Sequence, residues 1–385
     1  MVLYRKYRPQ KLSDLVGQEH VKNTLFSQLT LGNISHAYLF TGPKGTGKTT
    51  TARILAKAVN CQKVNSSEFI DHSNKSNKKN LKTKNYEPRT DLRKQVFSEP
   101  CNSCDSCTAI LEDRHIDVAE IDAASNRGID DVRNLREGIK LAPISGRFKV
   151  YILDETHMLT TEAANALLKT LEEPPPHAIF ILATTAPEKM PATIVSRCQV
   201  FNFFPATRAQ IIESLQKISK AEGRNLKDGI LSHIAAKSEG SYRDAVVLLE
   251  KVLVQDNLDE KILEQLLSGV DFETLKKFAL NLAEKNAKDA IVLLNDLITQ
   301  GVSAHVINSE FTAFLRNLLF VKVGVGDSLD LQADNLAALS KLAEKFTQAE
   351  ILELLRLFET AANQKNSPIA QLPAELAIAS FCLKE

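Results

Sequence analysis

The segment Gly42-Pro-Lys-Gly-Thr-Gly-Lys-Thr49 fits the pattern G-x-x-x-x-G-K-[ST], which can bind phosphate. Glycines let backbone N–H groups turn inward around an anion, and a helix that begins here adds positive potential. Lys48 would reach the β- and γ-phosphates of a nucleotide, and the Thr49 hydroxyl would bind Mg²⁺. The expected nucleotide contacts from this segment are Gly42, Gly45, Gly47, Lys48, Thr49 and Thr50.

Two adjacent carboxylates, Asp154 and Glu155, follow the apolar run Val150-Tyr-Ile-Leu153. A phosphate site of this type needs a carboxylate at the end of a neighbouring strand, so we expect Asp154 to bind Mg²⁺ together with Thr49. Glu155 would point away from Asp154, towards an attacking water, and is the candidate general base. The alternative is an acidic turn after a buried strand. The sequence has no guanine-specific N-K-x-D box, which favours adenine.

Four of the six cysteines, Cys61, Cys101, Cys104 and Cys107, lie within 47 residues. The spacing C-x-x-C-x-x-C lets neighbouring thiolates converge on one ion, and four thiolates would give Zn²⁺ a closed, structural site. Because 39 residues separate Cys61 from Cys101, His72 and His115 are alternative fourth ligands. An iron–sulfur site is the alternative to zinc, but no proline follows the triplet.

Alternating strands and helices must position these groups. An apolar strand from Ala37 precedes the glycine-rich turn and a helix follows it; further strands are expected at 118–121, 149–153 and 178–183. This alternation predicts an α/β fold with a parallel sheet covered on both faces. Residues 62–100, polar and with nine Lys/Arg against five Asp/Glu, are expected to form a flexible insertion.

The length of 385 residues predicts two or three domains, and the helical spacing of apolar residues after Pro205 sharpens this to three. Their expected ranges are 1–205, 206–268 and 269–385. The net charge of +1 indicates that any contact with nucleic acid comes from a local cluster of cations. The chain shows neither a signal-peptide pattern nor a run of 18 apolar residues, so the expected location is the cytoplasm.

Seven motifs together resemble the AAA+ clamp-loader ATPases over essentially the whole chain. They are Tyr4–Pro9, Asp14–Gln18, GPKGTGKT, LDE, Ala183–Thr185, Ser196–Cys198 and Gly240–Asp244. Among clamp loaders, Cys61 with the C-x-x-C-x-x-C run is most similar to the zinc module of the gamma/tau subunits of bacterial DNA polymerase III. The resemblance implies a P-loop AAA+ parallel sheet flanked by helices, a small helical lid domain and a C-terminal helical collar domain.

The resemblance also implies roles for residues whose types alone say little. Thr185 would be sensor 1, which bonds the attacking water or γ-phosphate. Arg197 would be the arginine finger, which enters the ATP site of the adjacent subunit, and Arg243 would be sensor 2 in its own subunit. Tyr7, Pro9 and Val16 would lie beside adenine. Arg127 would contact the DNA backbone.

The activity that the resemblance implies is that of an ATPase motor within the DNA polymerase III holoenzyme, a DNA-directed DNA polymerase by membership of the complex. ATP, Mg²⁺ and Zn²⁺ would be its cofactors. Its partners would be delta, delta-prime and further gamma/tau copies, the sliding clamp, and primer–template DNA bound without sequence preference. The alternatives are a delta-prime-like scaffold, which typically has a defective P-loop, and another AAA+ motor such as a branch-migration ATPase.

Overall fold

The computed structural model describes residues 2–63, 97–125, 135, 137–254, 270–326, 329, 333–364 and 367–383. The chain divides into two compact units, Met1–Glu250 and Lys251–Glu385. The predicted division into three domains stays a prediction. In the described ranges, no helix has both the length and the apolar character needed to cross a membrane.

The first unit is built on a sheet of five parallel strands in the order β2-β3-β4-β1-β5. The strands are β1 Ala37–Thr41, β2 Val118–Asp122, β3 Lys149–Asp154, β4 Ala178–Thr184 and β5 Gln199–Asn202. β4 lies between β3 and β1, and every one of its residues is buried. The carboxyl ends of β1, β3 and β4 therefore meet at one edge, where the turn after β1 and the acidic pair after β3 lie together.

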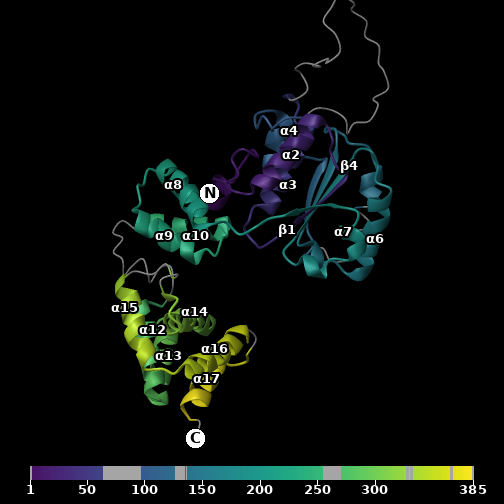
Figure 1. The fold of residues 1–385 in the computed structure, drawn as a ribbon. Helices are drawn as coiled ribbons and strands as arrows, with labels where there is room; N and C mark the ends of the chain where they lie inside the picture. Colours follow the sequence, from purple (N-terminus) through teal and green to yellow (C-terminus); the bar gives the residue numbers. More distant parts are fainter. Residues whose placement is uncertain are drawn as a thin grey trace, which may run out of the picture. The chain divides into compact units, whose positions relative to one another are not determined.

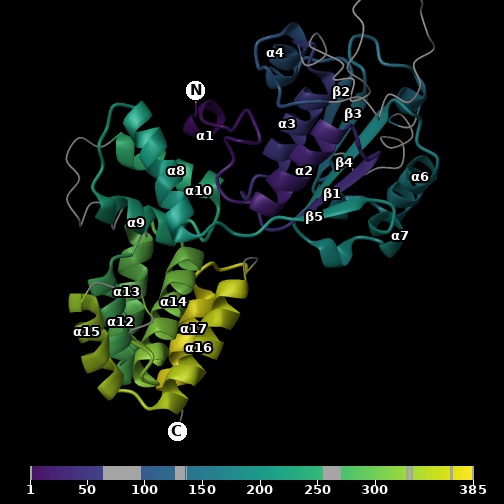
Figure 2. The same cartoon turned by 45° about the horizontal axis from the view of Figure 1, so that its top comes forward.

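Helices cover both faces of this sheet (Figures 1 and 2). On one face α2 and α3 pack against alternate strand residues such as Phe40, Ile152 and Ile181. On the other face α6 and α7 pack against the intervening residues, among them Leu39 and Leu153. The helices of this part are α1 Leu3–Lys6, α2 Glu19–Leu31, α3 Lys48–Asn60, α4 Asp105–Leu111, α6 Thr161–Glu172 and α7 Ala192–Val195, with short 3₁₀ turns η3 Thr156–Met158 and η4 Pro187–Lys189.

A group of three helices follows the sheet: α8 Arg208–Ala221, α9 Asp228–Lys237 and α10 Tyr242–Leu253. The start of α8 is fixed by a capping box, in which the Thr207 hydroxyl accepts from the Gln210 N–H and the Gln210 side chain accepts from the Thr207 N–H. Ile211 and Leu215 are buried at the helical spacing that the sequence predicts.

The second unit is helical in the part that the structure describes. Its core contains three phenylalanines in edge-to-face contact: Phe311 lies 4.6 Å from Phe278 and 4.7 Å from Phe358 between ring centroids. Its helices are α12 Phe272–Ala283, α13 Ala287–Thr299, α14 Ala304–Lys322, α15 Ala333–Glu344, α16 Gln348–Asn363 and α17 Leu372–Cys382. The predicted fold class, a parallel α/β sheet followed by helices, is confirmed.

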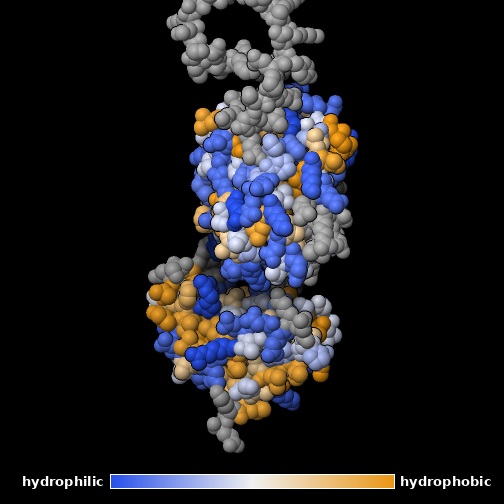
Figure 3. Space-filling model, turned by 90° about the vertical axis from the view of Figure 1, so that its right-hand side faces the viewer, coloured by the Kyte–Doolittle hydropathy of each residue, from blue (hydrophilic) through white to orange (hydrophobic). Residues whose placement is uncertain are grey.

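Two features differ from the sequence-based expectation. β5 is an additional edge strand, and only Phe201 of its four residues is buried. The expected insertion 62–100 is described only at its ends, and Phe97 near its carboxyl end is fully buried in the core beside Phe148. A large apolar side chain stabilises the fold when it is buried, so residues 97–100 belong to the folded part. On the side of the first unit that α6 and α7 cover, hydrophilic side chains predominate (Figure 3).

Candidate active site

The glycine-rich turn between β1 and α3 requires glycine at two close approaches. Gly42 has φ +136°, and a Cβ there would lie 2.1 Å from the Phe203 carbonyl oxygen. Gly45 has φ +77°, and a Cβ there would lie 1.9 Å from the Ser241 hydroxyl oxygen. Any larger residue would separate the turn from β5 on one side and from the start of α10 on the other. The turn is therefore tight, and the backbone N–H groups at the N-terminus of α3 are suited to bind an anion.

Lys48, the first residue of α3, is buried and points back into this turn. Its Nζ donates to the carbonyl oxygens of Gly42 at 2.7 Å and Pro43 at 2.8 Å. Burial lowers the pKa of Lys48, while the nearby carboxylates of Glu155 and Asp154 act in the opposite direction. The structure therefore holds this cation inside the phosphate loop, close to both acids.

The acidic pair at the end of β3 meets the start of α3 and the end of β4. The Thr49 hydroxyl donates to Asp154 Oδ2 at 2.7 Å, although the two lie 105 positions apart in sequence. The Thr185 hydroxyl, one residue beyond β4, donates to Glu155 Oε2 at 2.8 Å. Two oxygen ligands suited to Mg²⁺ and a candidate base therefore lie at one edge of the sheet.

Glu155 has an unusual backbone conformation. It has φ +47°, in the left-handed region, and its N–H donates to Asp154 Oδ1 at 2.9 Å. An L-residue other than Asn, Asp or Gly rarely adopts this region, and such strain is most often found at functional sites. His157 Nδ1 lies 3.4 Å from Glu155 Oε2 and 3.0 Å from the Thr184 hydroxyl. His157 is not among the predicted site residues, although it lies only two residues after Glu155.

The start of α10 contacts the phosphate loop directly. The Tyr242 N–H donates to the Gly45 carbonyl at 3.0 Å, and the Tyr242 hydroxyl donates to the Val16 carbonyl at 2.7 Å. Arg243 is exposed, with its guanidinium 4.8 Å from the centre of the Tyr4 ring. Arg243 is thus held beside the amino-terminal segment, on the helix that touches the loop.

The segment expected beside adenine is also tied to the helices after the sheet. The Tyr7 hydroxyl donates to Glu222 Oε1 at 2.6 Å, at the C-terminus of α8. Pro9 follows without regular structure, and the Val16 carbonyl already accepts from Tyr242. Tyr7 and Val16 therefore connect the amino-terminal segment to the end of α8 and the start of α10.

Arg197 follows α7 and precedes β5, and its side chain contacts the end of α6 and α7. Its Nη2 is 2.6 Å from Glu172 Oε1 at the end of α6, and its Nη1 donates to the Thr193 carbonyl at 2.8 Å. The arginine side chain is one-third exposed and that of Glu172 about half exposed. An ion pair this exposed contributes about 0–1 kcal/mol, so it holds the guanidinium without trapping it.

The four clustered cysteines converge as the spacing predicts. The Sγ atoms of Cys61, Cys101, Cys104 and Cys107 all lie within 4.8 Å of one another. Burial acts to raise the pKa of the Cys101 thiol, but hydrogen bonds from Ser103 and the neighbouring thiols outweigh it and lower that pKa to about 6. Four thiols in a mostly buried group fit a tetrahedral thiolate site for zinc without an open position.

The histidines offered as substitute ligands do not join the cysteines where the structure describes them. His115 is buried with Nε2 3.2 Å from the Ser106 hydroxyl and Nδ1 accepting from the Asp117 N–H at 3.1 Å. Both ring nitrogens are therefore used elsewhere. His72 and the proposed DNA contact Arg127 lie outside the described residues.

Removing metal from the cysteine cluster should unfold the cysteine module, which consists of Cys61, residues 101–104 and α4. We expect one zinc per chain in the wild type, and loss of that zinc with a clear fall in Tm for Cys104→Ser, because a structural zinc contributes about 10–16 kcal/mol of binding in small domains. Metal analysis and thermal unfolding measure both effects. Cys382→Ala is the matched control and should keep the zinc. Iron with visible absorbance in the wild type would contradict the zinc assignment.

Comparison with known proteins gives two family matches. Residues 17–88 and 90–207 match the model described as DNA polymerase III, delta subunit. Residues 258–382 match the model described as DNA polymerase III subunits gamma and tau domain III.

Individual relatives agree with these matches. The chain is 42% identical over 326 residues to DNA polymerase III subunit tau of Bacillus subtilis, covering 84% of this chain and 52% of that one. It is 34% identical over 324 residues to DNA polymerase III subunit gamma of Buchnera aphidicola subsp. Baizongia pistaciae, covering 84% of this chain and 79% of that one. The chain thus spans about half of the tau relative. Among solved structures, the Thermotoga maritima RuvB Holliday junction branch migration motor aligns with a TM-score of 0.46 at 20% identity, over 78% of this chain and 86% of that one.

Proposed function

Because this chain belongs to the gamma/tau family of bacterial DNA polymerase III subunits, we propose that it is an ATPase motor subunit of a clamp loader. ATP binding and hydrolysis would drive loading of the sliding clamp onto primed DNA. The observation that supports this most is the meeting of Thr49, Asp154, Glu155 and Thr185 at one end of the sheet, beside Lys48. A scaffold subunit would not need all five side chains in these positions.

The chemistry follows from these positions. Lys48 would exchange its bonds to the Gly42 and Pro43 carbonyls for bonds to the β- and γ-phosphates, with N–H groups of the turn around them. Thr49 and Asp154 would hold Mg²⁺, which offsets phosphate charge when bound. Glu155 would accept a proton from the attacking water, and Thr185 would orient that carboxylate. Arg243 would sense the γ-phosphate from α10.

The assembly would supply what one chain lacks. Arg197 would stabilise the transition-state charge in the site of a neighbouring subunit, so hydrolysis would depend on assembly. The partners would be delta, delta-prime and further gamma/tau copies, held through a collar at about residues 269–385. The sliding clamp and primer–template DNA would complete the cytoplasmic complex. Nucleotidyl transfer would belong to the holoenzyme, whereas this chain hydrolyses ATP.

The test is ATP turnover by the chain assembled with delta and delta-prime, with and without sliding clamp and primed DNA. We expect clamp and DNA together to raise turnover.

Lys48→Met should weaken ATP binding by about 100-fold or more, since it removes charge-assisted hydrogen bonds to two phosphates. Turnover that clamp and DNA leave unchanged, in a chain that binds ATP, would favour a different AAA+ motor. A wild type that binds no ATP would favour the scaffold.

A further inference from the structure

The amino-terminal segment at residues 3–15 bonds to two different parts of the first unit. At one end, Lys6 Nζ and the Tyr7 hydroxyl both lie 2.6 Å from Glu222 Oε1, at the end of α8. At the other end, Gln10 bonds to α3 and to the loop between Cys101 and Cys104. Tyr7 to Pro9, expected on the base side of the nucleotide, lie between these two attachments.

Lys57 on α3 is the centre of the second attachment. Its Nζ donates to the Gln10 carbonyl at 3.0 Å, to Gln10 Oε1 at 2.6 Å and to Asn102 Oδ1 at 2.7 Å. All three N–H bonds of the ammonium are thereby used, and Lys57 is only 2% exposed. A buried ammonium that lost these acceptors would carry a large desolvation cost. The three acceptor oxygens are therefore held in place around Lys57 Nζ.

Gln10, held by Lys57, also bonds to the residues that are expected beside the adenine base. Its Nε2 donates to the Arg8 carbonyl at 2.9 Å, and its own carbonyl also accepts from Asn102 Nδ2 at 3.3 Å. The position of the Arg8–Pro9 peptide is therefore set by a chain of hydrogen bonds that begins at Asn102. Lys48 and Lys57 lie on the same helix, nine residues or about 14 Å apart, so α3 carries both the phosphate contact and this attachment.

The cysteine cluster fixes the backbone of Asn102. Asn102 follows Cys101 directly and has φ +55°, a left-handed conformation that Asn tolerates better than most residues. The Ser103 N–H donates to Cys101 Sγ at 3.5 Å, as in a loop wrapped around thiolates. Convergence of the four cysteines thus places the Asn102 amide against Lys57 and Gln10.

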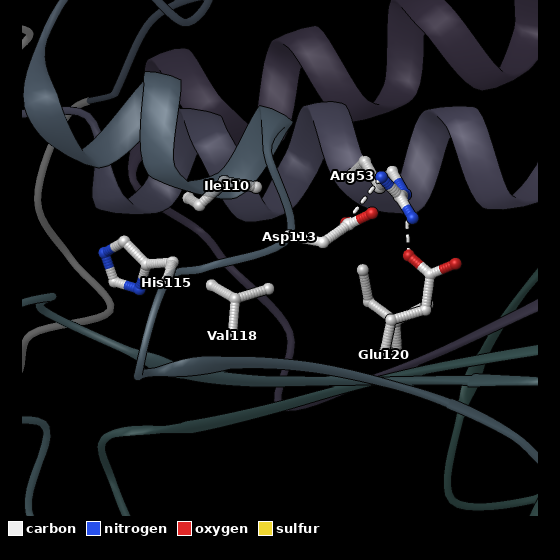
Figure 4. A pocket seen from close by; sticks show the side chains of 7 residues that line it. Arg53, Ile110, Asp113, His115, Val118 and Glu120 are labelled. Carbon is white, nitrogen blue, oxygen red and sulfur yellow. Dashed lines mark ion pairs between the residues drawn. The ribbon is translucent and has the colours of Figure 1, made fainter. Parts of the chain in front are cut away.

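The cysteine module also contacts α3 at a second place. Here a cavity of about 300 Å³ lies between α3, α4 and β2, and ion pairs line it (Figure 4). Arg53 of α3 lies 2.7 Å from Asp113, just after α4, and 2.6 Å from Glu120 of β2. The Arg53 guanidinium is thus already paired with two carboxylates at this cavity. The pairs link α3 to the residues after α4 and to β2.

We propose that the cysteine module positions the base side of the nucleotide site, with Asn102 and Lys57 as positioning residues that act through Gln10. The module fixes the position of Asn102, and Asn102 and Lys57 together fix the position of Gln10. Gln10 in turn fixes the position of the peptide between Arg8 and Pro9. This inference rests on the proposed function, since it requires that ATP binds at Lys48. The affinity for the adenosine part of ATP then depends on the module, whereas the affinity for the phosphates alone does not.

The test compares Mg-ATP with Mg-tripolyphosphate, which lacks the base, by calorimetry on the zinc-loaded full chain. Asn102→Gly keeps the left-handed backbone and removes only the amide. We expect it to weaken ATP binding about five- to tenfold, with tripolyphosphate binding and zinc content unchanged. Amide hydrogen exchange at residues 8–12 should become faster. Asn102→Asp, which keeps the acceptor for Lys57, should lie between Asn102→Gly and the wild type.

Glu112→Gln is the matched control, because the Glu112 carboxylate is exposed at the end of α4 and pairs with Arg114, away from Asn102 and the thiols. It should bind ATP as the wild type does. Unchanged ATP affinity in zinc-loaded Asn102→Gly would overturn the inference, and so would an equal loss for ATP and tripolyphosphate. A wild type that binds neither ligand would contradict the proposed function instead.

Discussion

Replacing Arg197 by alanine is expected to lower ATP turnover of the assembled clamp loader by about 10³- to 10⁵-fold, while nucleotide affinity stays unchanged. The reason is that an arginine finger acts on transition-state charge in a neighbouring site, not on ground-state binding in its own. The same variant measured as an isolated chain should hydrolyse ATP at the wild-type rate. Single-turnover hydrolysis with and without partners, together with equilibrium binding, measures the effect.

The contact with Glu172 makes this prediction sharper. The pair is worth about 1 kcal/mol at most, whereas a finger supplies about 4–7 kcal/mol of barrier, so leaving Glu172 costs little by comparison. Glu172→Gln should therefore leave assembled turnover within about fivefold of the wild type. Arg197→Lys keeps the charge but loses the planar fork, and should remain strongly impaired. If Arg197→Ala turned over normally in the assembly, the finger assignment would be wrong.

Much of the candidate site was predictable because its members follow strand ends. Asp154 and Thr185 each lie at or just beyond a parallel strand, and the carboxyl ends of such strands share one edge. The glycine-rich motif predicts its own backbone conformation, since Gly42 and Gly45 are needed where the turn approaches Phe203 and Ser241 closely. Four cysteines with metal-ligand spacing converge even though 39 residues separate one of them from the others, because a long loop costs little extra entropy to close.

The polar contacts that position these groups were not predictable in the same way. Glu172 meets Arg197, and Gln10 meets Lys57 and Asn102, only because distant elements pack together. No spacing rule joins such residues, and each of them alone reads as an ordinary surface side chain. β5 was missed for a related reason. Four residues with a single buried side chain, Phe201, are too short to show alternation, and the strand forms through pairing with β1.

Replacing Glu155 by glutamine should separate binding from hydrolysis within one chain. The amide has the shape of the carboxylate and can still accept from the Thr185 hydroxyl, which lies 2.8 Å away in the wild type. It cannot accept a proton from water at neutral pH, so we expect hydrolysis to fall about 10²- to 10⁴-fold. ATP affinity should remain, because Lys48 and the phosphate loop are untouched. The complex should then hold ATP and the clamp without release.

Thr185 provides the graded control for this prediction. Thr185→Val removes the hydroxyl but keeps the volume, so Glu155 loses one hydrogen bond and hydrolysis should fall about tenfold, far less than in Glu155→Gln. Thr185→Ser retains the hydroxyl and should restore most of the rate. A Glu155→Gln chain that hydrolysed ATP as fast as Thr185→Ser would assign the base to another group. His157 would be the first to examine, because its Nδ1 lies 3.4 Å from Glu155 Oε2 and an imidazole can accept a proton near neutral pH.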